Sequence, residues 1–82
     1  MNTTLKRITP FAVRLAATTL ILAEGRTTTL IVQQFLRNRG YQAGQAEVSK
    51  WLLMAALEEG WGIQSNGIFL IYAFPTLSAS LQ

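Results

Sequence analysis

The sequence predicts a small α+β domain of three helices followed by a two-stranded β-hairpin, with a short extra strand near residues 26–29. Three observations lead to this fold class. Three segments with helical character are followed by Gly25, Gly40 and Gly60, and glycine is favoured just beyond a helix C-terminus. After Gly60 the apolar residues form two short strand-like runs, and Asn66-Gly67 between them is a strong hairpin signal. The length of 82 residues allows a single small domain.

The first helix is expected from Pro10 to about Glu24. Thr9 suits the N-cap, and proline suits the first helical position because its missing N–H would be unpaired there anyway. Two apolar stripes run along this segment, and the sequence leaves open which one forms the core. One stripe consists of Phe11, Leu15, Thr18 and Leu22, and the other of Val13, Ala16, Ala17 and Leu20. The remaining stripe would be a weakly apolar surface or a seam for a dimer contact.

A brief β-branched strand over residues 26–29 then leads through a threonine cap into a second helix over Leu30 to Arg39. We expect its core face to hold Ile31, Val32, Phe35 and Leu36, with Gln33, Gln34 and Arg37 on the outer face. The connection from Tyr41 to Gly44 has the length of the turn in a helix-turn-helix.

The third helix, Gln45 to Glu59, is apolar on both sides. At about 100° per residue, one side carries Val48, Leu52, Ala55 and Glu59 with Trp51 at its edge, and the other carries Ala46, Lys50, Leu53, Met54 and Leu57. A helix that is hydrophobic all round is normally buried or meets a partner. So short a chain has few elements with which to bury it.

The hairpin repeats this excess of apolar surface. With Asn66-Gly67 as a two-residue loop, Ser65 would pair with Ile68, Ile63 with Leu70, and Trp61 with Tyr72. One face would hold Trp61, Ile63, Ile68, Leu70, Tyr72 and Phe74, and the other Phe69, Ile71 and Ala73. Three short helices can cover only one of these faces. We assign residues 9–75 to the domain, residues 1–8 to a flexible arm and residues 76–82 to a flexible tail.

Composition argues against several classes of function. The chain has no Cys or His, and its four acidic residues are all glutamate, so triads, thiol chemistry and the usual metal clusters cannot be assembled. We therefore expect no enzyme activity, no cofactor, no metal and no small-molecule substrate. The net charge of +3 suits contact with phosphate, or simply a mildly basic domain.

We expect a cytoplasmic chain, because no run approaches the roughly 20 apolar residues that a spanning helix needs, and because Arg14 interrupts the apolar segment that could otherwise be a signal peptide.

The order of elements resembles a winged helix-turn-helix domain over about residues 9–75. The resemblance is carried by Thr28-Thr29-Leu30-Ile31-Val32 with Phe35-Leu36, by Gly40-Tyr41 at the turn, by Gln45-Ala46 with Val48-Ser49 and Trp51-Leu52 in the third helix, and by Ser65-Asn66-Gly67 at the wing tip. In this superfamily the third helix commonly enters the DNA major groove and the wing touches the backbone. The resemblance implies that the DNA-binding residues would be Arg37, Arg39, Gln45, Ala46, Ser49, Lys50 and Asn66.

The sequence departs from a DNA reader where leucine and methionine occupy the outer side of the third helix. We therefore expect a winged-helix module that acts by protein–protein association, either as a homodimer or with another protein, and not at a membrane. The expected interface consists of Leu53, Met54, Leu57, Ile63, Ile68 and Leu70. A duplex-DNA-binding transcriptional regulator is the alternative. A natural module and an engineered winged-helix scaffold whose polar surface was replaced both fit the pattern.

Overall fold

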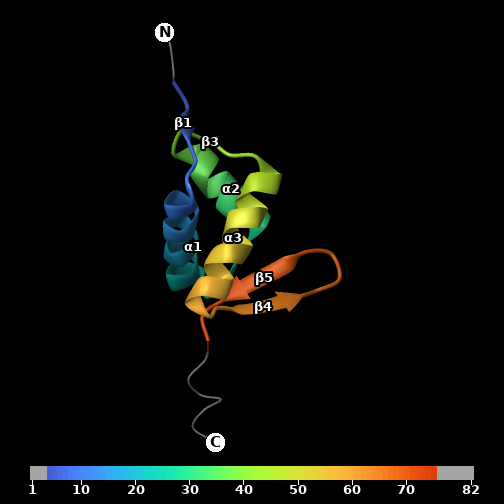
Figure 1. Ribbon diagram of the computed structural model, residues 1–82. Helices are drawn as coiled ribbons and strands as arrows, with labels where there is room; N and C mark the ends of the chain where they lie inside the picture. The colour runs from blue at the N-terminus through green and yellow to red at the C-terminus, as the bar shows by residue number, and fades with distance from the viewer. Residues whose placement is uncertain (1–3, 76–82) are drawn as a thin grey trace, which may run out of the picture.

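The computed structural model describes residues 4–75, which form three helices, a two-stranded sheet and a three-stranded antiparallel sheet (Figure 1). The helices pack together, the β4–β5 hairpin projects from one end of α3, and β1 and β3 lie at the other end. The expected α+β class is confirmed. The elements are β1 (Lys6–Arg7), α1 (Pro10–Glu24), β2 (Thr27–Thr28), α2 (Thr29–Asn38), β3 (Tyr41–Gln42), α3 (Gln45–Glu59), β4 (Gly62–Ser65) and β5 (Leu70–Ala73).

Local capping chemistry sets the helix ends. The Thr9 hydroxyl accepts a hydrogen bond from the Ala12 N–H at 3.0 Å and caps α1, which has the predicted bounds. α3 also has the predicted bounds, and Gly60 ends it with a φ of 75° that favours glycine. α2 begins one residue earlier than expected, because the Thr28 hydroxyl supplies its cap by accepting from the Ile31 N–H at 3.3 Å. It also ends one residue earlier, at Asn38.

The core forms where the three helices meet β5. On α1 the small-residue stripe is the buried one, joined by Ile21, whereas Phe11, Leu15 and Leu22 are exposed. Alanine at the contact allows helix backbones to approach closely, which accounts for the choice between the two stripes. The buried apolar side chains are Ile8, Val13, Ala16, Ala17, Ile21, Val32, Leu36, Ala43, Val48, Leu52, Ala55, Ala56 and Tyr72.

The predicted core face of α2 is wrong at two positions. Gln33, expected on the outer face, is buried, and its Nε2 donates to the Ala43 carbonyl at 3.0 Å. Ile31, expected in the core, is 47% exposed. A buried carbonyl in a connecting segment needs a donor, and Gln33 supplies one, so hydrogen bonding outweighs the simple apolar pattern here.

The described part of the predicted N-terminal arm is attached to the domain. β1 pairs in parallel with β3, and the Lys6 N–H donates to the Gly40 carbonyl at 2.8 Å. Ile8 is buried in the core. The ordered domain therefore begins before residue 9. Residues 1–3, and the predicted tail over residues 76–82, lie outside the described residues.

The hairpin exists, but its predicted register is wrong. Ser65 pairs with Leu70 and Ile63 with Tyr72, so four residues instead of two connect the strands. The Asn66 side chain explains the wider loop, because its Oδ1 accepts from the N–H groups of both Ile68 and Phe69 at 2.9 Å. The register moves by two residues, which keeps the side chains within β4 and β5 on their predicted faces, whereas Ile68 and Phe69 move from the predicted strand into the loop. β2 extends the sheet, as expected, by pairing with β5.

Tyr72 is fully buried, and its hydroxyl has no hydrogen-bond partner among the residues that the structure describes. Burial raises the pKa of this phenol above its ordinary value of 10.0, because ionisation is disfavoured away from water. In the folded state the proton is therefore retained to higher pH than in the unfolded chain, so stability falls as the pH rises above 10.0.

We predict that Tyr72→Phe leaves the melting temperature at neutral pH unchanged or raises it, because no hydrogen bond to a protein group within residues 4–75 is lost. Above about pH 10 the wild-type chain should lose stability more steeply than the variant. Thermal unfolding of both chains across pH 7 to 11 measures the difference. Parallel pH profiles would contradict the account.

Candidate interaction surface

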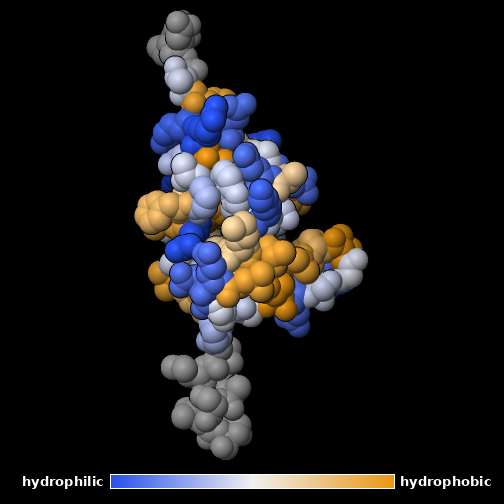
Figure 2. Space-filling view, viewed as in Figure 1, coloured by the Kyte–Doolittle hydropathy of each residue, from blue (hydrophilic) through white to orange (hydrophobic). Residues whose placement is uncertain are grey.

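The six side chains predicted as an interface are all exposed in the structure, and we call this set the apolar face. Leu57 is 68% exposed and Ile68 is 85% exposed. The set consists of Leu53, Met54 and Leu57 on α3, Ile63 on β4, Ile68 in the hairpin loop and Leu70 on β5. Figure 2 shows hydrophobic side chains gathered over the lower part of α3 and the adjoining hairpin, whereas hydrophilic ones dominate the end that carries β1 and β3.

The three residues that α3 contributes to the apolar face point away from the core. Val48, Leu52, Ala55 and Ala56 face the core and are buried, and Leu53 and Leu57 follow one position after two of them. At 100° per residue, Leu53 and Leu57 point to the flank that Gln45 and Ser49 also occupy. Gln45 and Ser49 line a groove with hairpin residues 68–70, so this flank of α3 is the one beside the hairpin.

The two strands contribute from one side of the sheet. Ile63 and Leu70 share a face with Tyr72, because side chains alternate along a strand and Ile63 lies opposite Tyr72. Tyr72 is buried in the core, so this is the face toward the helices. The helices do not cover all of this face: Ile63 on the outer strand β4 and Leu70 next to the hairpin loop stay partly exposed, at 38% and 37%. They therefore continue the surface formed by α3.

A groove of about 660 Å³ extends the apolar face toward α2. Sequence reasoning missed three of its exposed apolar side chains, Leu30, Ile31 and Phe69. Leu30 and Ile31 belong to the first turn of α2, and Phe69 to the hairpin loop. No local signal indicated them, because the apolar pattern of α2 put Ile31 in the core and the assumed two-residue turn put Phe69 in a strand.

The residues implied as DNA contacts do not form one set. Gln45 and Ser49 line the groove just described, and Ala46 and Lys50 are exposed on α3. Asn66 is occupied in its own loop. Arg37 and Arg39 lie at the C-terminal end of α2, where the Arg37 Nε donates to the Ala43 carbonyl at 3.1 Å and the Arg39 guanidinium lies 3.6 Å from the Phe35 ring centroid. The structure thus brings Gln45 and Ser49 to the hairpin and leaves both arginines bound to their own domain.

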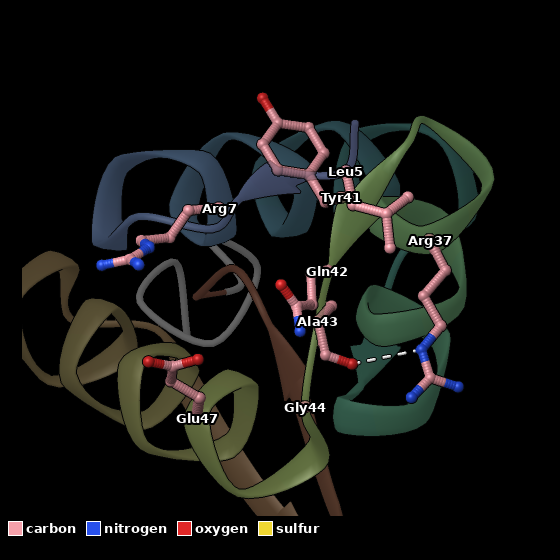
Figure 3. A pocket seen from close by; sticks show the side chains of 8 residues that line it. All are labelled: Leu5, Arg7, Arg37, Tyr41, Gln42, Ala43, Gly44 and Glu47. Carbon is pink, nitrogen blue, oxygen red and sulfur yellow. Dashed lines mark hydrogen bonds between the residues drawn. The ribbon is translucent and has the colours of Figure 1, made fainter. Parts of the chain in front are cut away.

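A second groove, of about 730 Å³, runs beside β3 and is shown in Figure 3. Arg7 and Arg37 both line it. They extend on opposite sides of the β3 backbone and do not point toward each other, and Glu47 lies on the Arg7 side. Strong anion sites need convergent donors. The two cations of this groove therefore do not make a defined anion site.

Two acidic side chains at the end of α3 form ion pairs with α1. Glu58 and Glu59 pair with Arg14 of α1 at 2.7 and 3.5 Å. Within residues 4–75 there is no group of three metal-binding side chains. None of the helices in this part of the chain has the length and hydrophobicity to cross a membrane.

Comparison with known proteins gives no match to a family model, to a curated protein or to a solved structure.

Proposed function

We propose that this chain is a winged-helix module that acts by protein–protein association through the apolar face. The observation that carries the proposal is the exposure of all six apolar side chains on neighbouring elements, α3 and the β4–β5 hairpin. Contiguous apolar surface on a small soluble domain usually marks an interaction site. In this reading α3 corresponds to the recognition helix and the hairpin to the wing, on the basis of element order alone.

The amount of apolar surface exposed on this face is large enough to support association. The exposed fractions of its six side chains add up to roughly those of three fully exposed side chains. Covering them would contribute on the order of 5 to 9 kcal/mol per subunit, at about 1.5 to 3 kcal/mol for each side chain. Association of two proteins costs about 4 to 15 kcal/mol in lost freedom of motion. A contact in which both subunits contribute apolar surface therefore offsets this cost.

Hydroxyl-radical footprinting tests whether the face is covered in solution. As the protein concentration is raised from the nanomolar to the high micromolar range, labelling of Leu57 and Ile63 should fall by several fold. Labelling of Phe11 and Leu22 on α1, which are exposed to 67% and 73% and so comparable to Leu57, should stay constant. Constant labelling of all four residues would rule out self-association through this face. Equal protection of all four would indicate non-specific aggregation.

Duplex-DNA binding is the second candidate, favoured by the groove that Gln45 and Ser49 form with the hairpin and by the net charge of +3. Gln45 could read an adenine edge and Lys50 a guanine edge. Against it, Leu53, Met54 and Leu57 would have to face a polar groove or solvent.

If the chain binds DNA through Arg37, Arg39 and Lys50, the log–log salt slope of the affinity should be about −3, and Lys50→Met should reduce its magnitude by about 0.9. A mobility-shift titration between 50 and 200 mM salt measures both values. Glu47→Gln, on the same helix, serves as a control and should not reduce the slope. No shift of duplex DNA even at low salt would exclude this function.

A further inference from the structure

We propose that β4 pairs in the antiparallel direction with β4 of a second copy of the chain. The two copies are related by a two-fold axis at Gln64, and their two three-stranded sheets become one six-stranded sheet. This inference rests on the proposed function, because it specifies the partner and the contact that position the apolar face.

β4 is the outer strand of its sheet. The strand order is β2–β5–β4, so one side of β4 bonds to β5, and no strand within residues 4–75 pairs with the other side. All four residues of β4 are exposed. In Figure 1 the hairpin stands away from the helices, which leaves this edge accessible. An open edge of this kind is a template for another strand.

The hydrogen-bond pattern of the hairpin identifies which backbone groups are free. The Asn66 N–H donates to the Phe69 carbonyl at 3.3 Å, so residues 66 and 69 form a hydrogen-bonded pair. Bonded and non-bonded pairs alternate along an antiparallel ladder. Gln64 is therefore bonded to Ile71, whereas the N–H and C=O groups of Ile63 and Ser65 point outward from the edge.

These outward groups are self-complementary about Gln64. In an antiparallel pair centred there, Ile63 lies opposite Ser65 of the second copy, and Ser65 lies opposite Ile63 of the second copy. Each of these two positions becomes a hydrogen-bonded pair, so every free N–H and C=O of the two residues finds a partner. A second copy supplies this match by symmetry, whereas another protein would need its own open edge.

β4 lacks the features that normally protect an edge. Such strands commonly carry lysine, proline, a bulge or an inward-pointing charge, and Gly62–Ser65 carries none of these. No charged residue follows Glu59 in the sequence. Arg26 is the one charged side chain in the groove beside Gly62 and Gln64, and its flexible stem allows the guanidinium to point away from the axis. Two copies can therefore approach without strong like-charge repulsion.

The paired edges also bring the two apolar faces together. Ile63 and Leu70 lie on the helix side of the sheet, as do Leu53 and Leu57 of α3. A two-fold axis perpendicular to the joined sheet leaves the helices of both copies on this same side. The same contact thus uses the free backbone groups of β4 and covers exposed apolar side chains beside them.

Single cysteines test the register, because the unmodified chain contains no cysteine. In the proposed pair Gln64 lies opposite its own copy in a non-hydrogen-bonded position, where Cα atoms are about 4.5 Å apart and within the range of a disulfide. Ser65 is also exposed, but it is displaced from its own copy by two residues, or about 7 Å along the strands. Added to the separation between strands, this exceeds the disulfide range of about 7 Å between Cα atoms.

The experiment compares Gln64→Cys with Ser65→Cys in the full chain. Each variant is oxidised with a glutathione redox buffer, and cross-linking is followed by non-reducing electrophoresis, while sedimentation gives the mass of the unmodified chain. We expect Gln64→Cys to cross-link at least about tenfold faster. If the unmodified chain associates but the two rates are equal or reversed, β4 pairing is overturned and association through the apolar face stands. If the unmodified chain is monomeric at every concentration, both β4 pairing and self-association fail.

Discussion

Leu57→Gln should weaken self-association by roughly 30- to 1,000-fold. Leu57 is 68% exposed on α3 and lies within the apolar face. Burying that fraction of a leucine is worth about 1 to 2 kcal/mol, and a two-fold dimer contains the substitution twice. The combined loss of about 2 to 4 kcal/mol gives the predicted range, since 1.4 kcal/mol corresponds to tenfold. The dissociation constant from sedimentation equilibrium measures the effect.

Leu53→Asp should be at least as disruptive, because an unpaired carboxylate would have to lose its water in the contact. The matched control is Leu22→Gln, which changes a leucine that is 73% exposed on α1, outside the apolar face. Its dissociation constant should stay within about threefold of the wild-type value. If Leu22→Gln weakens association and Leu57→Gln does not, the outer stripe of α1 forms the contact, and the assignment to α3 and the hairpin is wrong.

Leu52→Ala should destabilise the folded chain by about 2 to 5 kcal/mol, the usual cost of removing a buried leucine. Leu52 is fully buried in α3 and belongs to the core cluster that joins α1, α2 and β5. A small domain has only about 5 to 15 kcal/mol of stability in total, so a large part of the variant could be unfolded at 37 °C. Urea unfolding followed by fluorescence of Trp51 and Trp61 gives the free energy of unfolding.

Leu22→Ala is the control for this stability measurement, because it removes the same atoms from an exposed position outside the apolar face. Its effect should remain within about 0.5 kcal/mol. All chains are compared at one low protein concentration, so that association does not contribute to the measured stability. Equal losses for the two variants would show that α3 is not packed as described.

The helices could be predicted because their ends depend on local chemistry. Thr9 caps α1 with its own hydroxyl, and Gly25 and Gly60 take up a positive φ at the helix C-termini. The buried side of α3 also followed from the spacing of Val48 and Leu52. These features involve residues a few positions apart, so the sequence contains the information directly.

The errors arise where distant residues or competing hydrogen bonds decide the structure. The pairing of Lys6 with Tyr41 joins segments that are far apart in the chain and carry no strand-like alternation. The hairpin register depends on the Asn66 side chain, which bonds two backbone N–H groups of its own loop and widens the turn. Neither feature has a signal in the periodicity of apolar residues.

For the candidate surface, exposure of the six residues followed from counting how much apolar area three helices can cover. The exposure of Leu30 and Phe69, which line the adjoining groove, could not be predicted in the same way. Their exposure depends on how the first turn of α2 and the hairpin loop sit beside α3. Tertiary packing of this kind is set by the whole domain, not by the local sequence.

The mass of the chain in solution decides whether the apolar face is an association surface. Sedimentation should show a shift from 9.1 kDa toward twice that mass as the concentration rises, with no change when duplex DNA is added. A constant mass of 9.1 kDa at all concentrations, together with a complex that forms only with DNA, would contradict the account and favour the DNA-binding alternative.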